Sequence, residues 1–126
     1  MAHKVCIMYL RGNQKGELNE LYVLNDVWYS SDGIQWIRAT ENAAFSKRAY
    51  HKSVVYDDEM WVIGGLDKDG CKNDVWCSND GKNWKLVTSS AAFQPRYSQA
   101  SFVLDNKMWV MGGIGGVSMQ NIWWSK

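Results

Sequence analysis

Proline, cysteine and histidine are scarce in this chain of 126 residues, which contains one, three and two of them. Cys6, Cys71 and Cys77 are odd in number and lack the paired spacing of zinc ligands. We therefore expect bystander thiols in a reducing, cytoplasmic environment and no bound metal, while a Cys71–Cys77 disulfide stays open as an alternative. With only His3 and His51, the chain has no catalytic triad and no histidine cluster. Neither enzyme chemistry nor a cofactor is predicted for this chain alone.

An excess of one charge and a long apolar run are also missing. The chain has 14 basic and 13 acidic residues, for a net charge of +1. Nucleic acids and anionic membranes attract surfaces that carry excess positive charge, so neither partner is expected. The apolar run near the N-terminus covers only residues 5–10, which is too short for a signal-peptide core or a membrane span. A soluble protein is predicted.

Aromatic residues and glycine are abundant, with eight tryptophans, six tyrosines and eleven glycines. Aromatic residues favour strands, and glycine favours tight turns. No segment shows the 3.6-residue periodicity of an amphipathic helix. The composition therefore indicates an all-β fold of short strands.

The sequence repeats with a period of 48 residues. Residues 25–72 and 73–120 are identical at 21 of 48 positions without a gap. Such a period is typical of solenoids and propellers, in which each unit buries its faces against its neighbours. The repeated residues that we expect to be structural are Trp28, Trp36, Trp61, Gly64, Gly65, Trp76, Trp84, Trp109, Gly112, Gly113 and Trp124.

Each period contains four strand signals, best seen in the middle copy. The predicted strands cover residues 53–56, 60–63, 74–77 and 84–87. Asp57-Asp58 closes the first hairpin, a polar loop follows the Gly64-Gly65 doublet, and residues 78–81 form a tight turn in which Asp-Gly takes positive φ. The expected unit is a four-stranded antiparallel sheet. Its tryptophans, each able to bury about 150–250 Å², supply the contact between units.

This unit resembles the kelch repeat. The residues that carry the resemblance are Trp61-Val62-Ile63-Gly64-Gly65 followed by Trp76 and Trp84, and Trp109-Val110-Met111-Gly112-Gly113 followed by Trp124. The resemblance implies kelch-type blades of a β-propeller, which usually has six or seven blades in a ring. We expect residues 1–126 to form a single partial propeller domain, with blade 1 at about residues 1–48, blade 2 at about 49–96 and blade 3 at about 97–126.

Both ends depart from the repeat. Residues 6–24 resemble second and third strands, but an alternative alignment matches residues 3–4 with 51–52 and makes residues 5–9 a first strand. The last blade stops after its third strand. An incomplete ring exposes apolar blade faces, which are association sites or aggregation liabilities. The missing blades are expected from a longer chain, from a two-fold homodimer or from another protein.

Kelch propellers bind ligands at one end of the central channel, on the loops that enter the inner strands. The resemblance therefore directs attention to residues 45–51 and 93–99. Each arginine in these loops either binds an acidic peptide, a carboxylate or a sugar acid, or ties its own loop to neighbouring backbone and carboxylates. The candidate ligand-binding residues are Arg48, Tyr50, His51, Arg96, Tyr97 and Gln99.

The loop after the glycine doublet is the second candidate surface, because residues 66–71 differ strongly from residues 114–119. No glutamate completes a calcium loop there, so no metal is expected. The favoured interpretation is a kelch protein-binding or assembly module with a protein or peptide partner. The alternative is part of a sugar-binding or sugar-isomerising propeller similar to the bacterial sialic-acid epimerases.

Overall fold

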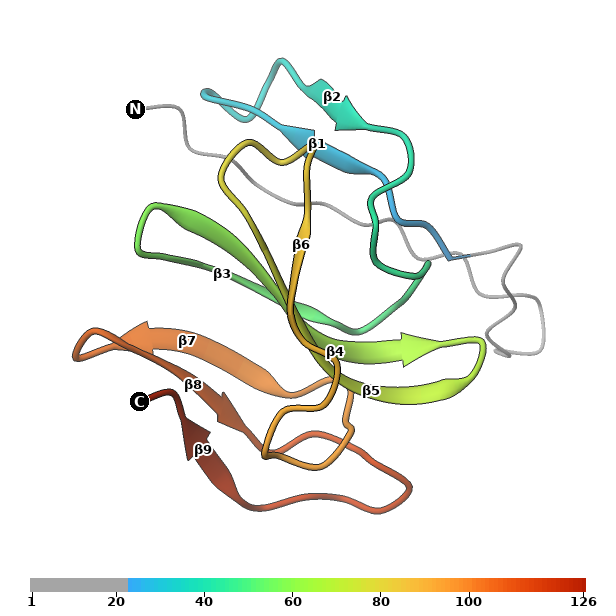
Figure 1. Ribbon diagram of the computed structural model, residues 1–126, viewed down its shortest axis with the longest axis vertical. Helices are drawn as coiled ribbons and strands as arrows, with labels where there is room; N and C mark the ends of the chain where they lie inside the picture. Colours follow the sequence, from blue (N-terminus) through green and yellow to red (C-terminus); the bar gives the residue numbers. More distant parts are fainter. Residues whose placement is uncertain (1–22) are drawn as a thin grey trace.

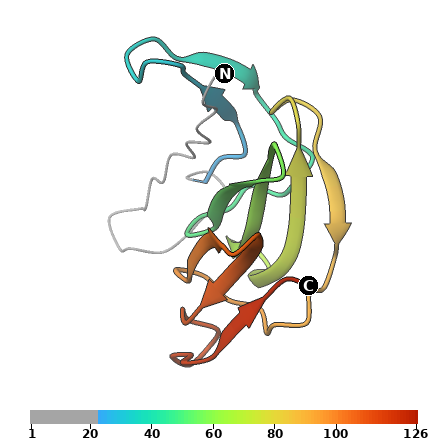
Figure 2. The ribbon, with the colours of Figure 1, turned by 90° about the vertical axis from the view of Figure 1, so that its left-hand side faces the viewer.

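The computed structural model describes residues 23–126, and these form three antiparallel sheets that follow one another in chain order (Figure 1). The same succession is seen after a quarter turn (Figure 2). No helix that could cross a membrane occurs in the described part of the chain. The predicted all-β architecture is confirmed, while the predictions for residues 1–22 lie outside the described residues. The strands are β1 (Val27–Tyr29), β2 (Ile37–Thr40), β3 (Lys52–Tyr56), β4 (Glu59–Asp67), β5 (Gly70–Ser78), β6 (Lys85–Thr88), β7 (Ala100–Leu104), β8 (Lys107–Met111) and β9 (Ile122–Trp124).

The middle sheet is a meander of four strands in the order β3-β4-β5-β6. Tyr56 pairs with Glu59 across the first hairpin. Asp57 and Asp58 both have positive φ, at 53° and 57°, as a two-residue hairpin turn of the primed type requires. The four predicted strands are therefore present and are connected as neighbours.

The glycine doublet lies inside a strand and not at its end. β4 runs through Gly64 and Gly65 to Asp67, where the sequence predicted a polar loop. A register shift between Ile63 and Gly65 forms a bulge, after which pairing with β5 resumes as Gly65↔Lys72. Both glycines have positive φ, so the doublet bends the strand without ending it.

The turn before β6 is longer than the predicted tight turn. Only Gly81 has positive φ, at 79°, and the Ser78 and Asp80 side chains organise the loop. The Asp80 carboxylate accepts hydrogen bonds from the backbone N–H groups of Lys82 and Asn83, both at 2.8 Å. The Trp84 indole N–H donates to the Gly81 carbonyl at 2.9 Å. This loop sets the position of the tryptophan before β6 begins.

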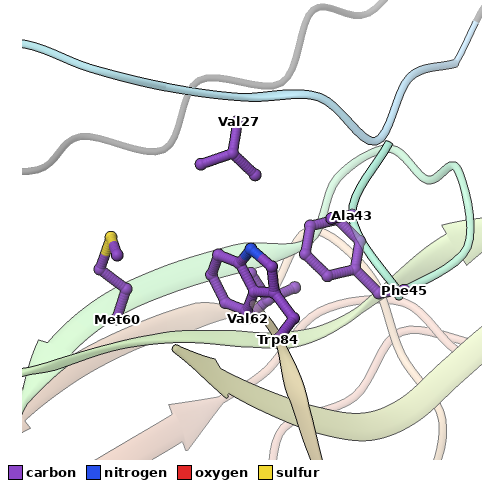
Figure 3. Packing of buried hydrophobic residues seen from close by; sticks show 6 residues of the cluster. All are labelled: Val27, Ala43, Phe45, Met60, Val62 and Trp84. Carbon is purple, nitrogen blue, oxygen red and sulfur yellow. The ribbon is translucent and has the colours of Figure 1, made fainter. Parts of the chain in front are cut away.

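Two apolar clusters join consecutive sheets. The first lies between the β1–β2 sheet and the middle sheet, and Figure 3 shows its members gathered around the indole of Trp84. The second lies between the middle sheet and the β7–β9 sheet. Three buried members of the second cluster lie 48 residues after members of the first, as the repeat predicts. The first cluster contains Val27, Ala43, Phe45, Met60, Val62 and Trp84, and the second contains Ile63, Val75, Phe93 and Val110.

The outer sheets are smaller in the described residues. β1 and β2 form a two-stranded sheet, and the third sheet ends with β9. β9 pairs with β8 on one side, and no described strand lies on its other side. Ile122 and Trp124 are 49% and 57% exposed. The third sheet therefore presents an open, apolar edge strand.

Candidate functional site

The loops at residues 45–51 and 93–99 connect each sheet to the first strand of the next, β3 and β7. Phe45 and Phe93 anchor them in the two apolar clusters. The guanidinium of Arg48 lies over the Phe45 ring and that of Arg96 over the Phe93 ring, each at 5.6 Å from the ring centroid. The two loops are therefore built alike, one repeat apart.

Arg48 is buried and fully bonded. Its guanidinium forms a bidentate pair with the Asp74 carboxylate at 2.7 and 2.9 Å. It also donates to the Gly64 carbonyl at 3.0 Å, and to the carbonyl and the hydroxyl of Ser46. Burial acts to raise the pKa of Asp74, but the hydrogen bonds from Arg48 and Trp76 hold that pKa below its usual value. The arginine ties the loop to both β4 and β5.

Arg96 is equally buried but has no carboxylate partner among residues 23–126. It donates to the carbonyls of Gln94 and Gly112 and to the amide oxygen of Asn121, at 2.8–3.1 Å. Its Nη2 is buried without a hydrogen-bond partner among the described residues, and burial lowers the pKa of Arg96. These are the contacts expected of an arginine that ties its own loop. Ligand binding by Arg48 and Arg96 stays a prediction, and the burial of both groups argues against it.

The tyrosines of the two loops come together at the surface. The rings of Tyr50 and Tyr97 have centroids 5.7 Å apart, and Tyr50 is 44% exposed. The backbone carbonyl of Tyr50 accepts a hydrogen bond from the N–H of Ser98 at 2.9 Å, which holds the loops side by side. We call Tyr50 and Tyr97 the tyrosine surface. Of the six candidate residues, Tyr50 is the one with an exposed side chain.

His51 and Gln99 face inward. Burial, together with the nearby charges of Arg48 and Lys52, lowers the pKa of His51 to about 3. Its Nδ1 has no hydrogen-bond partner among residues 23–126. Gln99 is fully buried and donates to the Ile63 carbonyl at 2.9 Å. The structure therefore places both residues against the glycine doublets, His51 beside Gly65 and Gln99 beside Gly64 and Gly113.

The repeated hydrogen bonds of the tryptophans identify the architecture. The indoles of Trp28 and Trp76 donate to Asp26 and Asp74, and those of Trp61 and Trp109 donate to carbonyls five residues earlier. A sequence model of the KLHDC2/KLHL20/DRC7 kelch-repeats domain matches residues 2–125. The chain belongs to the kelch-repeat family. A search of curated protein sequences found no match. Kelch-repeat domains generally mediate protein interactions, and the three sheets are kelch blades that do not close into a ring.

The loop after the glycines joins β4 to β5 in the second kelch blade. It forms a hairpin in which Asp67 pairs with Gly70. The buried Asp67 carboxylate accepts hydrogen bonds from the Ser46 hydroxyl and the Asp69 N–H, and lies 3.6 Å from the Lys72 ammonium. Cys71 and Cys77 are both free thiols. Within residues 23–126, no cluster of three or more histidine, cysteine or acidic side chains is placed to hold a metal ion.

The sequence prediction missed an apolar cavity of about 320 Å³ between the second and third kelch blades. It opens beside β9 and the loop that follows β6. The sequence offers no direct signal for it, because the cavity is formed by side chains that meet between two sheets. The lining residues are Trp61, Ile63, Val75, Val87, Thr88, Ala91, Ala92, Phe93, Met108, Val110, Trp123, Trp124 and Ser125.

Proposed function

We propose that this chain is a protein-binding segment of a kelch propeller and that it recognises its partner through the tyrosine surface. The supporting observation is a tyrosine that is 44% exposed at a position with a left-handed backbone, with a φ of 55°. Bulky residues rarely adopt this left-handed conformation.

The equivalent position in the next blade shows which property of Tyr50 the backbone requires and which it does not. Ser98 lies one period after Tyr50 and has the same φ of 55°. The fold therefore needs a left-handed residue at this position, but it does not need an aromatic ring. Tyrosine combines a rigid apolar ring with a hydroxyl group and is enriched in protein interfaces. The Tyr50 ring contacts the Tyr97 ring and remains 44% exposed, so the pair offers an aromatic surface to a partner.

Peptides selected from a random library on the wild-type chain provide the test. Tyr50→Gly should lower their affinity at least about tenfold, equivalent to about 1.4 kcal/mol. The matched control, Ser98→Gly, changes the same backbone position in the next blade and should leave affinity unchanged. Both variants should keep the melting midpoint, because glycine relieves the left-handed strain and offsets its own entropic cost. Peptides that bind Tyr50→Gly as well as wild type would refute the tyrosine surface.

The sugar-propeller alternative is tested in the same way. Tyrosine rings also stack on sugars, so the chain is titrated with a sialic acid. The protein-binding proposal would be replaced by the sugar alternative under two results. The sugar would bind saturably and lose that binding in Tyr50→Gly, and no peptide would be selected from the library.

We also propose that residues 1–126 are one partial propeller domain, divided near residues 48 and 96, and that further blades complete the ring. The open β9 edge supports this, because Trp123 and Trp124 on it are 36% and 57% exposed. A second copy of the chain or a longer chain supplies the remaining blades.

A further inference from the structure

Three Asp-Gly pairs occur in the chain, at residues 32–33, 69–70 and 80–81, and no Asn-Gly pair occurs. Aspartate isomerises most readily before glycine, because glycine has no Cβ to keep its backbone nitrogen away from the preceding carboxyl group. In this reaction the glycine nitrogen attacks the carboxyl carbon and closes a five-membered succinimide ring. The reaction therefore requires a carboxyl group and a glycine N–H that are free to meet.

Both reacting groups of Asp80-Gly81 are hydrogen-bonded to other partners. The Asp80 carboxylate accepts from the backbone N–H groups of Lys82 and Asn83 and from the Asn83 side-chain amide, each at 2.8 Å. The N–H of the buried Gly81 donates to the Ser78 hydroxyl oxygen at 2.9 Å. The hydrogen bonds from Asn83 hold the pKa of Asp80 below its usual value, which keeps the carboxyl group ionised and a poor target for attack.

Asp32-Gly33 is held in the same way, one period earlier. The Asp32 carboxylate accepts from the backbone N–H groups of Ile34 and Gln35 at 2.8 and 2.9 Å. The Gly33 N–H donates to the Ser30 hydroxyl oxygen at 2.8 Å. The hydrogen bonds from Gln35 and Ile34 likewise lower the pKa of Asp32. The repeated loop thus protects both of its Asp-Gly pairs.

The pair Asp69-Gly70 lies outside such a loop, at the tip of the β4–β5 hairpin. Asp67 and Gly70 form the last pair of this ladder, and strand ends open most easily. The Asp69 side chain is exposed, and its backbone N–H donates to the Asp67 carboxylate at 2.9 Å, a bond that leaves its own carboxyl group free. A Cβ on Gly70 would meet nothing within 4 Å, so the surroundings leave space for the ring to close.

We infer that Asp69 is a site of isoaspartate formation in the folded protein, whereas Asp32 and Asp80 are protected by their loops. A bond forms between the Gly70 nitrogen and Cγ of Asp69, and the carboxyl hydroxyl leaves with the amide hydrogen as water. A second water then opens the ring at the former main-chain carbonyl. The product is isoaspartate, in which the main chain runs through the former side chain. One water leaves and one returns, so the mass is unchanged and no other reactant is needed.

The modification changes the loop after the glycine doublet. Isoaspartate lengthens the main chain by one carbon between Asp69 and Gly70, at the point where the hairpin closes. The nearby Asp67 carboxylate also accepts a hydrogen bond from the Ser46 hydroxyl at 2.8 Å, so the lengthened tip adjoins a contact between two loops. One period later the residues are Val117 and Ser118, which cannot react in this way. The new α-carboxylate is the group that isoaspartate methyltransferases methylate, and the site is independent of the tyrosine surface.

The test compares the three pairs in the full chain, incubated at neutral pH either folded or unfolded in urea until the unfolded chain has isomerised. Isoaspartate is assigned by peptide mapping with electron-transfer fragmentation and counted by enzymatic methylation. In the folded chain it should form at least about tenfold faster at Asp69 than at Asp32 or Asp80, whose loops must first open. In urea the three rates should be similar. Equal rates in the folded chain, or no product at Asp69, would overturn the inference.

Three variants test the cause of the difference. Ser78→Ala removes the hydroxyl that binds the Gly81 N–H and should raise the rate at Asp80 severalfold while leaving Asp69 unchanged. Ser30→Ala is the matched change for Asp32 and serves where Ser78→Ala lowers the melting midpoint. Asp69→Glu should remove the product from the hairpin, because the larger ring that glutamate would form closes far more slowly. Unchanged rates in both serine variants would show that the loops do not protect their aspartates.

Discussion

Arg48 and Arg96 occupy equivalent positions, but within the described residues Arg48 has a carboxylate partner and Arg96 does not. The residue that corresponds to Asp74 one repeat later is Ile122, which is 49% exposed at the start of β9. As a result, Nη2 of Arg96 has no hydrogen-bond partner in the described part of the chain. An unpaired buried donor on a charged group is costly. Arg96 therefore makes fewer hydrogen bonds between its loop and the third blade than Arg48 makes in the second blade.

Ile122→Asp should stabilise the protein by about 1–2 kcal/mol. The new carboxylate restores the bidentate acceptor of Arg96 and an acceptor for the indole of Trp124, as Asp74 does for Arg48 and Trp76. Urea unfolding at pH 7 measures the change. Ile122→Asn is the uncharged control and should gain less. An equal gain in both variants, or a gain that persists with Arg96→Met, would contradict this explanation.

His51 should make stability fall in mild acid. Its pKa is lowered to about 3 by burial and by the charges of Arg48 and Lys52, against about 6.5 in an unfolded chain. The unfolded state therefore binds a proton that the folded state does not, and stability is lost as pH falls from 6.5 toward 3. Between pH 6.5 and 5 the expected loss is at most about 2 kcal/mol.

Urea unfolding at pH 5, 6 and 7 checks the contribution of His51. His51→Gln should flatten the dependence over this range, while His3 remains in both proteins and cancels in the comparison. If stability depends on pH equally in wild type and His51→Gln, the pKa of His51 is not lowered in the folded state.

At the scale of the strand, the glycine doublet acts through close backbone approach. A Cβ on Gly65 would lie 2.8 Å from the His51 Cβ and 3.0 Å from the Ala49 carbonyl oxygen. The doublet thus lets β4 pass beside the loop that carries Ala49 and His51. The bulge it creates keeps β4 paired with β5 beyond the doublet.

Gly65→Ala should cost about 3–5 kcal/mol, from left-handed strain and steric overlap together. Gly70→Ala is a matched control, because Gly70 has a similar φ of 117° but nothing within 4 Å of its Cβ position. Strain alone should cost about 1–2 kcal/mol there. Thermal unfolding of both variants gives the two values, and equal losses would show that close packing at Gly65 is unimportant.

The hairpins of the middle sheet were predicted from the sequence only in part. Alternating apolar residues and the Asp57-Asp58 turn located the first hairpin of the middle sheet within a residue or so. The extension of β4 through Gly64 and Gly65 was not predicted, because a glycine doublet usually ends a strand, and only tertiary contact with the Ala49 loop shows that it bends one. The sequence predicted a tight turn at residues 78–81, but the loop is longer. The Asp80 carboxylate accepts hydrogen bonds from backbone N–H groups, and these bonds compete with ordinary turn geometry.

For the whole molecule, the repeat made the blade architecture predictable, since residues 48 positions apart recur in the same strands of successive sheets. The tyrosine surface was found in part, because the sequence marked the loops but did not separate the exposed Tyr50 from the buried Arg48. The apolar cavity between the second and third blades was missed, because it depends on how side chains from two sheets pack against each other.

Assembly is the property that belongs to the whole molecule. Apolar edge residues such as Trp123 and Trp124 are exposed on β9, and closed two-fold symmetry is the commonest way for a single chain to bury such a surface. We expect static light scattering at micromolar concentration to give twice the chain mass of 14.4 kDa. Trp123→Lys should return the protein to the monomer, because a lysine on the covered edge buries an unpaired charge. The matched change Val55→Lys, at a residue that is 61% exposed on β3, should leave the dimer intact if β9 forms the interface. A stable wild-type monomer would contradict the dimer and assign the remaining blades to a longer chain.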